Sequence, residues 1–437
     1  MAGTSTPGTI STRQQRIATL ARQMPDRALR TLAHQIDVEW LKEAWRQTRK
    51  DGATGIDGQT ATAYAQDLEG NLARLLDRVK TGLYRAPPVR RSYIPKTDGK
   101  MRPLGIPTIE DKVLQRAFLM LLEPLYETVF RDCSHGFRPG RSAHQALEQL
   151  RDHLRSVGGG WVLDVDIRAF FDSVVHAILR DLVQQRVRDG VVIRQIGKWL
   201  NAGVMEAGAL TRSDLGTPQG GVISPLLANI YLHYAVDEWF AAEVVPRLRG
   251  RAHLVRYADD FVMVFEHEED ARRVMEVLPK RLARFGLEVS PEKTRLVRFE
   301  HPSSDADPPD SFDFLGFTFH WGKSKKGSQT IRWKTAKKRV ARTLHAFWEY
   351  CRDNRHRPVR TQHATLSRKL RGHYQYFGLT MNMRALDQVF DRVKAIWRYW
   401  LDRRSQKARM TWKRFKPLLS RLPLPKPQVV HSVFRTA

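Results

Sequence analysis

The sequence is poor in cysteine and lacks any long apolar run. Only Cys133 and Cys351 occur among its 437 residues, which excludes a disulfide framework and a zinc finger of the CxxC type. No apolar stretch approaches the roughly 18 to 20 residues that a membrane-spanning helix needs. With 42% hydrophobic and 27% charged residues, the composition predicts a soluble, globular protein without a membrane partner. We expect about three folded units and a reducing, cytoplasmic compartment.

Acidic residues are scarce near the C-terminal end. Residues 323–437 hold 30 Lys and Arg against 5 Asp and Glu, whereas residues 1–322 hold 44 against 41. Nearly all of the net charge of +28 therefore lies in one segment, which predicts a polyanionic partner. A solubilising basic tail is the alternative, but disordered tails are poor in tryptophan. This segment has five: Trp333, Trp348, Trp397, Trp400 and Trp412. We interpret it as a folded nucleic-acid-binding region.

The N-terminal part mixes helical patterns with one hairpin signal. Residues 1–25 contain no acid, which faintly resembles an organellar transit peptide, but a mobile N-terminus is the favoured interpretation. Apolar spacing predicts helices over residues 27–50 and 61–80. The dipeptide Asp98-Gly99, which follows a basic stretch at 90–96, predicts a β-hairpin.

Apolar spacing also predicts the organisation of the basic segment. Three helical stripes, at 340–351, 366–377 and 386–400, indicate a small bundle of helices. Residues 322–329 are rich in Gly, Ser and Lys and are interpreted as a hinge. The domain boundary is therefore predicted near residue 325.

Two acidic sites lie in apolar surroundings. Asp259 and Asp260 interrupt two apolar stretches at 254–257 and 261–265, a pattern that predicts a hairpin, and Asp164 and Asp166 follow the apolar strand that begins at Trp161. Carboxylates at a buried site repel one another unless cations neutralise them. Hard oxygen ligands from two strands suit Mg²⁺, and a pair of such ions can clamp both oxygens of a phosphoryl transfer. The two sites together favour a nucleotidyl transferase.

A series of ordered blocks runs through nearly the whole chain. They are GIDG at 55–58, RPLGIP at 102–107, SHGFRPGRS at 134–142, DIRAFFD at 166–172, GTPQGG at 216–221, YADD at 257–260, GLEVSPEKT at 286–294 and FLGF at 314–317. In this order the blocks resemble those of the reverse transcriptases that bacterial group II introns encode. The resemblance implies an α+β right-hand polymerase fold with fingers and palm and an all-α, basic thumb or maturase domain.

The resemblance divides the chain into three parts. Residues 1–85 would form an N-terminal extension and the start of the fingers, residues 86–325 the fingers and palm, and residues 326–437 the helical thumb. In the last part, residues 371–376 depart from the family's Gly-Trp-aromatic pattern at His373. No zinc-type endonuclease module is expected to follow, and two cysteines could not support one.

The resemblance also implies the catalytic residues. The first carboxylate of the family stands five residues before an aromatic residue that limits space at the sugar 2′ position, which selects Asp166 with Phe171 and leaves Asp164 structural. Asp166 and Asp259 would be the main ligands of two Mg²⁺ ions, with Asp260 as a third carboxylate and Ile167 in both the metal and the nucleotide sites. Lys293 would protonate the departing pyrophosphate, although its side chain could instead be solvated.

Further residues are expected to bind nucleotide or nucleic acid. Lys96 and Arg102 flank the predicted hairpin turn and suit a triphosphate, the alternative being solvation of an exposed strand edge. Gln219 and Gly220 lack bulk where backbone must approach the template or nucleotide. Phe171 could alternatively pack in the core. The residues assigned to nucleic acid are Arg138, Arg141, Lys337, Lys338, Arg339, Arg371 and Tyr374.

These assignments predict an RNA-directed DNA polymerase with several partners. They are deoxynucleoside triphosphates, an RNA template with a DNA primer, target DNA, and a group II intron RNA whose splicing and retrohoming the protein would assist. One alternative is a related reverse transcriptase in host defence or DNA repair. Another is a non-enzymatic RNA-binding maturase, against which the presence of Asp166, Asp259 and Asp260 argues. The oligomeric state, monomer or homodimer, stays open.

Overall fold

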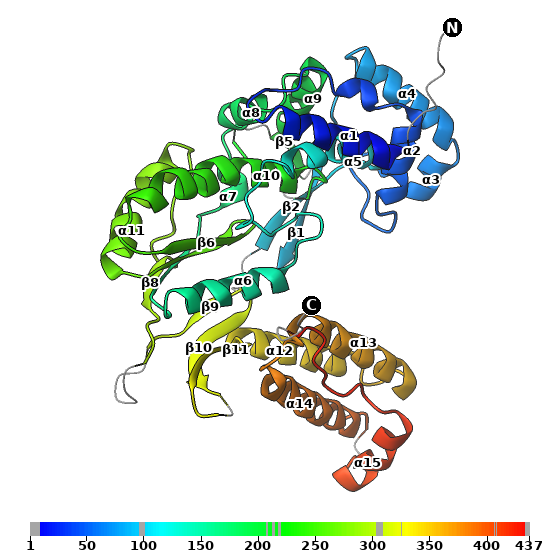
Figure 1. Ribbon diagram of the computed structural model, residues 1–437. Coiled ribbons are helices and arrows are strands. Elements are labelled where there is room, and N and C mark those ends of the chain that lie inside the picture. Colours follow the sequence, from blue (N-terminus) through cyan, green and yellow to red (C-terminus); the bar gives the residue numbers. More distant parts are fainter. Residues whose placement is uncertain are drawn as a thin grey trace. The chain divides into compact units, whose positions relative to one another are not determined.

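A computed structural model describes residues 9–95, 101–206, 209–211, 215–216, 220–302, 309–324, 326–405, 407 and 409–432 (Figure 1). Close contacts divide the chain into two compact units. The first comprises Met1–Ala146 and Leu163–Leu296, and the second comprises Leu147–Val162 and Val297–Ala437. Among the described helices, none has an apolar stretch long enough to cross a membrane.

The first unit carries most of the helices. They are α1 (Ile10–Gln23), α2 (Val38–Gln47), α3 (Ala61–Ala65), α4 (Leu68–Lys80), α5 (Ile109–Tyr126), α7 (Phe170–Ser173), α8 (His176–Gln184), α9 (Gly190–Leu200), α10 (Ser224–Leu232) and α11 (Glu268–Ala283). Side-chain caps begin several of them: the Asp37 carboxylate accepts from the Trp40 N–H, and that of Asp67 accepts from the Gly70 N–H. Two π-helical segments, His233–Asp237 and Phe240–Val244, continue the chain after α10.

Two four-stranded sheets lie among these helices. The first has the order β2-β1-β4-β5, formed by β1 (Val89–Pro95), β2 (Met101–Ile106), β4 (Val204–Glu206) and β5 (Ala209–Thr211). The second has the order β6-β7-β3-β8, formed by β3 (Trp161–Val165), β6 (Ala252–Tyr257), β7 (Asp260–Phe265) and β8 (Arg295–Arg298). β6 and β7 form the predicted apolar hairpin, and α11 packs against β7 (Figure 1).

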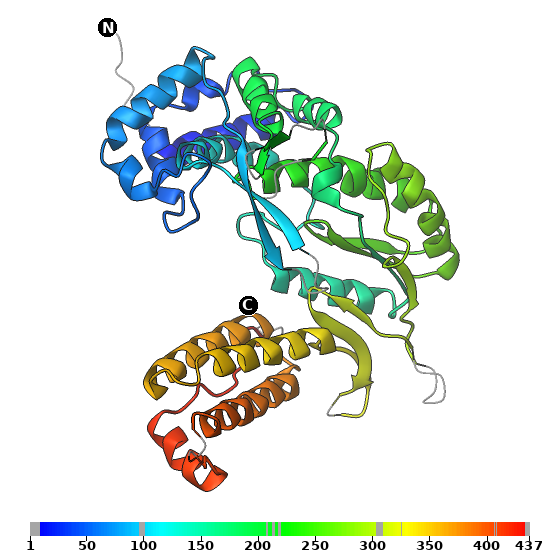
Figure 2. The same cartoon turned by 180° about the vertical axis from the view of Figure 1, so that it is seen from behind.

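The second unit combines a small sheet with a bundle of helices. The sheet has the order β11-β10-β9, formed by β9 (Phe312–Phe314), β10 (Phe317–Lys323) and β11 (Gln329–Thr335). The helices are α12 (Lys337–Asp353), α13 (Val359–Phe377), α14 (Met383–Asp402) and α15 (Trp412–Arg421), and most of α6 (Ala143–Ser156) belongs to this unit too. α12, α13 and α14 lie side by side in both views (Figures 1 and 2). Their shared core includes Leu370, Val389 and Trp397. The predicted α+β class with a helical C-terminal region is confirmed.

The predicted hinge is a hairpin turn. Phe317 to Lys323 of β10 pair antiparallel with Gln329 to Thr335 of β11, and the Ser324 N–H donates to the Ser328 carbonyl at 2.8 Å. The Gly and Ser residues that suggest a hinge serve this turn, where Gly327 has φ of +84°. The compact units therefore divide near residue 297 and not near 325, and β11 lies inside the segment that was expected to be entirely helical.

Three expectations for the N-terminal part are also wrong. Helix α1 lies within the segment expected to be mobile. It is held against the rest of the unit because Ile17 and Ala21 are buried and Arg13 pairs with Asp37 at 2.8 Å. The helix expected over residues 27–50 is shorter, since α2 begins only at Val38, where the Asp37 side chain caps it. The pattern at 61–80 forms two helices, α3 and α4.

Candidate active site and nucleic-acid surface

The candidate active site begins at the turn between β6 and β7. Tyr257 pairs with Asp260 across the hairpin, so Ala258 and Asp259 form a two-residue turn. Ala258 has φ of +58°, the left-handed conformation that such a turn requires. The turn is displaced by one residue from the break expected at Asp259 and Asp260. Asp259 is consequently half-buried in the turn, whereas Asp260 begins β7 and is exposed.

Asp166 follows β3, the strand next to β7 in the sheet. It lies close enough to Asp259 for the two carboxylates to interact. Burial raises the pKa of Asp259, and the negative charge of Asp166 raises it further, while the guanidinium groups of Arg102 and Arg256 act in the opposite direction. The two acidic sites predicted from the sequence are thus brought together at one end of the sheet.

The segment that follows α11 surrounds Asp166. The Lys293 ammonium donates to Asp166 Oδ2 at 3.0 Å, the Ser290 N–H donates to the Asp166 carbonyl at 2.8 Å, and the Asp166 N–H donates to Thr294 Oγ1 at 3.3 Å. Ile167 is buried and forms an antiparallel bridge with Val289, so only its main chain could face a ligand. The blocks at 166–172 and 286–294 therefore form one local structure.

The described residues include no group of three or more His, Cys, Asp or Glu side chains in a metal-binding arrangement. The donor set at this end of the sheet is the carboxylate pair of Asp166 and Asp259. Its chemistry fits a divalent cation, since a hard cation is favoured by carboxylate oxygens and would relieve their mutual repulsion. Asp164, in contrast, pairs with Arg295 at 3.3 Å.

A buried ion pair supports the hairpin turn from behind. Arg256 and Asp237 are both fully buried, with Nη2 and Oδ2 2.5 Å apart, and Arg256 Nη1 also donates to the Ala258 carbonyl and to Asn229 Oδ1, each at 3.0 Å. Burial alone would raise the pKa of Asp237, but the charge of Arg256 outweighs it and holds that pKa below its ordinary value. Sequence analysis missed this cluster, although a charged residue inside the apolar stretch 254–257 was a usable signal.

The block at 134–142 packs against the same turn. A Cβ atom at Gly136 would lie 2.3 Å from the Ala258 nitrogen, so no side chain fits there. The His135 N–H donates to the Arg256 carbonyl at 2.9 Å, and Asn229 Nδ2 donates to the Gly136 carbonyl at 2.7 Å. The block therefore holds the turn between β6 and β7 in place.

Arg138 of this block is not presented to a nucleic acid, contrary to expectation. Its side chain is only 3% exposed, pairs with Glu127 at 2.9 Å, and donates to the carbonyls of Arg131 and Ser134. A guanidinium with its donors engaged inside the protein stabilises the loop. Arg141 is half-buried and pairs with Asp132.

The residues expected at the nucleotide lie on two further segments. Phe171 is half-buried, with its ring 5.2 Å from that of Phe170, and a Cβ atom at Gly216 would lie 3.3 Å from the Phe171 carbonyl oxygen. Arg102 is exposed on β2, and its charge acts on Asp259. Gly220 has φ of +113° and approaches the Gly105 carbonyl so closely that an added Cβ atom would lie 2.6 Å from its oxygen. Lys96 and Gln219 lie outside the described residues.

A second buried network holds the segment that follows Gly220. Gln115 Oε1 accepts from the Val222 N–H at 2.7 Å, while Gln115 Nε2 donates to Asp111 at 2.9 Å. Asp111 also accepts from the Tyr84 hydroxyl and the Trp199 indole, and burial raises its pKa to about 6. Nothing in the sequence pattern of α5 distinguished these residues.

The basic residues of the second unit do not share one surface. Lys337, Lys338 and Arg339 are exposed at the start of α12. Lys337 lines a groove of about 910 Å³ together with Arg384 and other basic side chains, whereas Arg339 lines a smaller cavity between α12 and α13. Lys337 and Arg339 therefore line two different sites within this unit, and Lys338 lines neither.

Arg371 is exposed on α13, but Tyr374 is not available to stack on a base. The Tyr374 side chain is 1% exposed within the helical core, and its hydroxyl donates to the Pro425 carbonyl at 3.1 Å. The prediction that Tyr374 binds nucleic acid is wrong, because its position on the apolar face of α13 directs the side chain inward.

Comparisons with known proteins agree with these blocks. The profile of the family described as "Reverse transcriptase (RNA-dependent DNA polymerase)" matches residues 94–319. Protein YkfC of Escherichia coli K12 is 33% identical over 362 residues, which cover 74% of this chain and 91% of YkfC. Group II intron-encoded protein LtrA of Lactococcus lactis subsp. cremoris is 35% identical over 263 residues, 57% of this chain and 43% of LtrA.

A shorter similarity extends to a plant protein. Nuclear intron maturase 1, mitochondrial, of Arabidopsis thaliana is 33% identical over 87 residues, 20% of this chain and 12% of that protein. The family profile spans more than half of the chain, and the alignment with YkfC covers nearly all of that relative. The chain therefore belongs to the reverse transcriptase family, the RNA-dependent DNA polymerases, and is similar over part of its length to a group II intron-encoded protein.

Proposed function

We propose that the chain copies RNA into DNA by two-metal nucleotidyl transfer at Asp166, Asp259 and Asp260, and that it binds a group II intron RNA. The observation that carries the catalytic part is the placement of Asp259 beside Asp166, where burial and the neighbouring charge both raise the pKa of Asp259. A carboxylate whose pKa is shifted by burial and by a specific neighbouring charge is a candidate for a catalytic site.

The metal ligands would be Asp166 and Asp259, with Asp260 at the exposed start of β7 and the main chain of Ile167 beside them. When bound, Mg²⁺ ions would stabilise the negative charge that develops on the attacking and leaving oxygens. Lys293 Nζ lies 3.0 Å from Asp166 Oδ2, and from this position it would pass a proton to a departing pyrophosphate.

Nucleotide binding is assigned to the segments next to this pair. Arg102, whose charge already acts on Asp259, would bind a phosphate of the incoming triphosphate. The close approach of Gly220 to Gly105 leaves backbone groups, without side-chain bulk, at this position. Lys96 and Gln219 are proposed to act with them from segments outside the described residues.

Replacing Phe171 by alanine is expected to admit ribonucleotides. The half-buried ring would limit space beneath the sugar, so its removal should shift the ratio of ribo- to deoxyribonucleotide incorporation by roughly ten- to two-hundred-fold. Single-nucleotide extension of a DNA primer on an RNA template measures this ratio. Phe171→Tyr retains the ring and serves as the matched control. A ratio that is equal in the alanine variant and the unaltered chain would make Phe171 a packing residue.

The second unit is proposed to bind intron RNA and to assist splicing and retrohoming by target-primed reverse transcription. The charge of the segment from residue 323 onward and the basic groove lined by Lys337 and Arg384 support RNA binding, since phosphate contacts dominate affinity for nucleic acids. An RNA template, a DNA primer and target DNA would be the other nucleic-acid partners.

Neutralising Lys337, Lys338 and Arg339 together as alanines is expected to weaken binding of all RNAs and to flatten its salt dependence. Each lost phosphate contact should reduce the slope of log K against log salt by about 0.7 to 0.9. Fluorescence anisotropy of labelled RNA at several salt concentrations measures both quantities. Arg272, Arg273 and Lys280, exposed on α11, provide a control variant with the same loss of charge. Unchanged affinity and slope would mean that the three charges at α12 only solvate the surface.

Sequencing of RNA crosslinked to the full chain in its own cells tests the intron partner. Enrichment of an RNA with group II intron structure that encloses or flanks the reading frame is the expected result. Enrichment of unrelated cellular RNAs, with DNA synthesis intact, would favour a reverse transcriptase in host defence or repair.

A further inference from the structure

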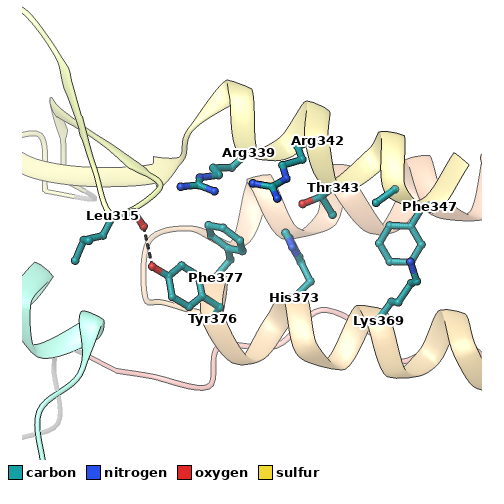
Figure 3. Close-up of a pocket in the computed structure, with 10 residues that line it drawn as sticks. Leu315, Arg339, Arg342, Thr343, Phe347, Lys369, His373, Tyr376 and Phe377 are labelled. Carbon is teal, nitrogen blue, oxygen red and sulfur yellow. Dashed lines mark hydrogen bonds between the residues drawn. The ribbon is translucent and has the colours of Figure 1, made fainter. Parts of the chain in front are cut away.

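A cavity of about 440 Å³ lies between α12 and α13, with Leu315 at one end (Figure 3). Residues 339, 342, 343, 346 and 347 of α12 and residues 369, 373, 376 and 377 of α13 line it. Spacings of three and four residues place each set on one face of its helix, so the two faces meet across the cavity. Of the residues that line the cavity, only Arg339 has an assigned role, which is to bind RNA through its charge.

The walls of the cavity are aromatic. The ring of Phe377 lies 4.8 Å from that of His373 and 4.8 Å from that of Tyr376. Tyr376 is 37% exposed, and its hydroxyl donates to the Leu315 carbonyl at 2.9 Å, which fixes the ring at the mouth of the cavity (Figure 3). Flat aromatic walls of this kind suit a planar ring, because base and aromatic faces stack.

Three cations surround these walls: Arg339, Arg342 and Lys369. In the part of the chain that the structure describes, none of the three has a carboxylate within ion-pair distance. Arg339 and Arg342 are exposed, so their charge is directed to solvent at the entrance. A planar ligand that carries anionic groups would complement both the walls and the entrance.

A polar atom inside the cavity lacks a hydrogen-bond partner among the described residues. The side chain of His373 projects from α13 toward α12 (Figure 3), the residue is 8% exposed, and its Nε2 atom forms no hydrogen bond with any residue that the structure describes. Burial lowers the pKa of His373 to about 4, so the imidazole is neutral at pH 7. A buried polar atom without a partner is unfavourable, and a bound ligand with a complementary polar edge would supply that partner.

We propose that this cavity receives one unpaired nucleobase of a bound RNA, stacked against Tyr376 and Phe377 and hydrogen-bonded to His373 Nε2. Arg339, Arg342 and Lys369 then bind the phosphates on either side of that nucleotide. This inference rests on the proposed RNA-binding function and adds a specific contact to it. A base held in this way distinguishes a loop or bulge from a continuous duplex.

The test uses the full chain and a stem-loop RNA with 4-thiouridine in its loop. Thr343→Trp fills the cavity without removing a charge and should weaken binding of the stem-loop roughly ten- to one-hundred-fold with an unchanged salt slope. A blunt duplex of the same stem should bind equally to both proteins. His345→Trp, on α12 but outside the cavity, is the control and should bind the stem-loop normally. Photocrosslinks should map to the peptide that contains Tyr376 and Phe377.

Equal binding of the stem-loop by Thr343→Trp and the unaltered chain, or crosslinks confined to other peptides, would overturn the cavity assignment and leave RNA binding intact. Failure of the unaltered chain to bind any RNA would overturn both. AMP that displaces the stem-loop as effectively as unlabelled RNA would assign the cavity to free nucleotides and overturn the RNA proposal. Should Thr343→Trp not fold, His373→Phe retains the ring and removes Nε2, and it should bind the stem-loop roughly two- to tenfold more weakly.

Discussion

Asp259→Asn is expected to reduce DNA synthesis on a primed RNA template about a thousand-fold or more while RNA binding is retained. The substitution keeps the shape of the side chain but removes a charge that would hold a divalent cation, and metal stabilisation of the reacting oxygens contributes several kcal/mol to such reactions. Asp166→Asn should have the same effect. Primer extension measures the loss, and Asp164→Asn is the matched control because the Asp164 carboxylate pairs with Arg295.

The stability of Asp259→Asn separates a catalytic role from a structural one. The folded chain binds a proton at Asp259 more tightly than the unfolded chain does, because burial and Asp166 raise its pKa. The ionised carboxylate therefore destabilises the fold at pH 7, and the stability that the protonated group contributes is lost as pH rises through the folded pKa. The neutral asparagine should thus leave the thermal midpoint at pH 7 unchanged or higher. Full activity of Asp259→Asn, or of Asp166→Asn, would contradict the carboxylate assignment.

Arg256→Met is expected to destabilise the first unit by about 3 to 5 kcal/mol, because it leaves the Asp237 carboxylate buried without its partner. The same change removes the donor to the Ala258 carbonyl, so the fraction that still folds should synthesise little DNA. Urea denaturation followed by circular dichroism measures the stability. Arg251→Met, which breaks the exposed pair with Glu266, is the control and should change stability by about 1 kcal/mol or less.

The difference in stability between the unaltered chain and Arg256→Met depends on pH in a direction that the pKa of Asp237 predicts. Arg256 holds the pKa of Asp237 below its ordinary value, so the ion pair contributes its full stability above the unfolded pKa of about 3.9. That contribution is lost as pH falls through the lower pKa that Asp237 has in the folded chain. In Arg256→Met, burial without a partner raises the pKa of Asp237 above its ordinary value. The difference in stability between the unaltered chain and Arg256→Met should therefore be largest above that raised pKa and shrink as pH falls through it. The double variant Arg256→Met with Asp237→Leu should regain much of the lost stability. A double variant as unstable as Arg256→Met alone would contradict the buried-charge explanation.

Much of the local structure follows from short-range pattern. The β6–β7 hairpin and the helices α12, α13 and α14 form where apolar spacing predicts them, because burial of an apolar face selects the period of the element. Turn positions proved less reliable. The turn before Asp260 is displaced by one residue, since it depends on neighbours outside the segment.

The sequence by itself determined that this is a reverse transcriptase, because the order of its blocks and the charge of its C-terminal segment can be read without coordinates. Only the tertiary structure decided which of the expected residues are exposed and which are packed inside the protein. Arg138 and Tyr374 are of types that bind nucleic acid, yet packing turns both inward. The pairing of Arg256 with Asp237 and the cavity at His373 join residues from separate elements. Such contacts are set by how the elements pack, and no local pattern encodes them.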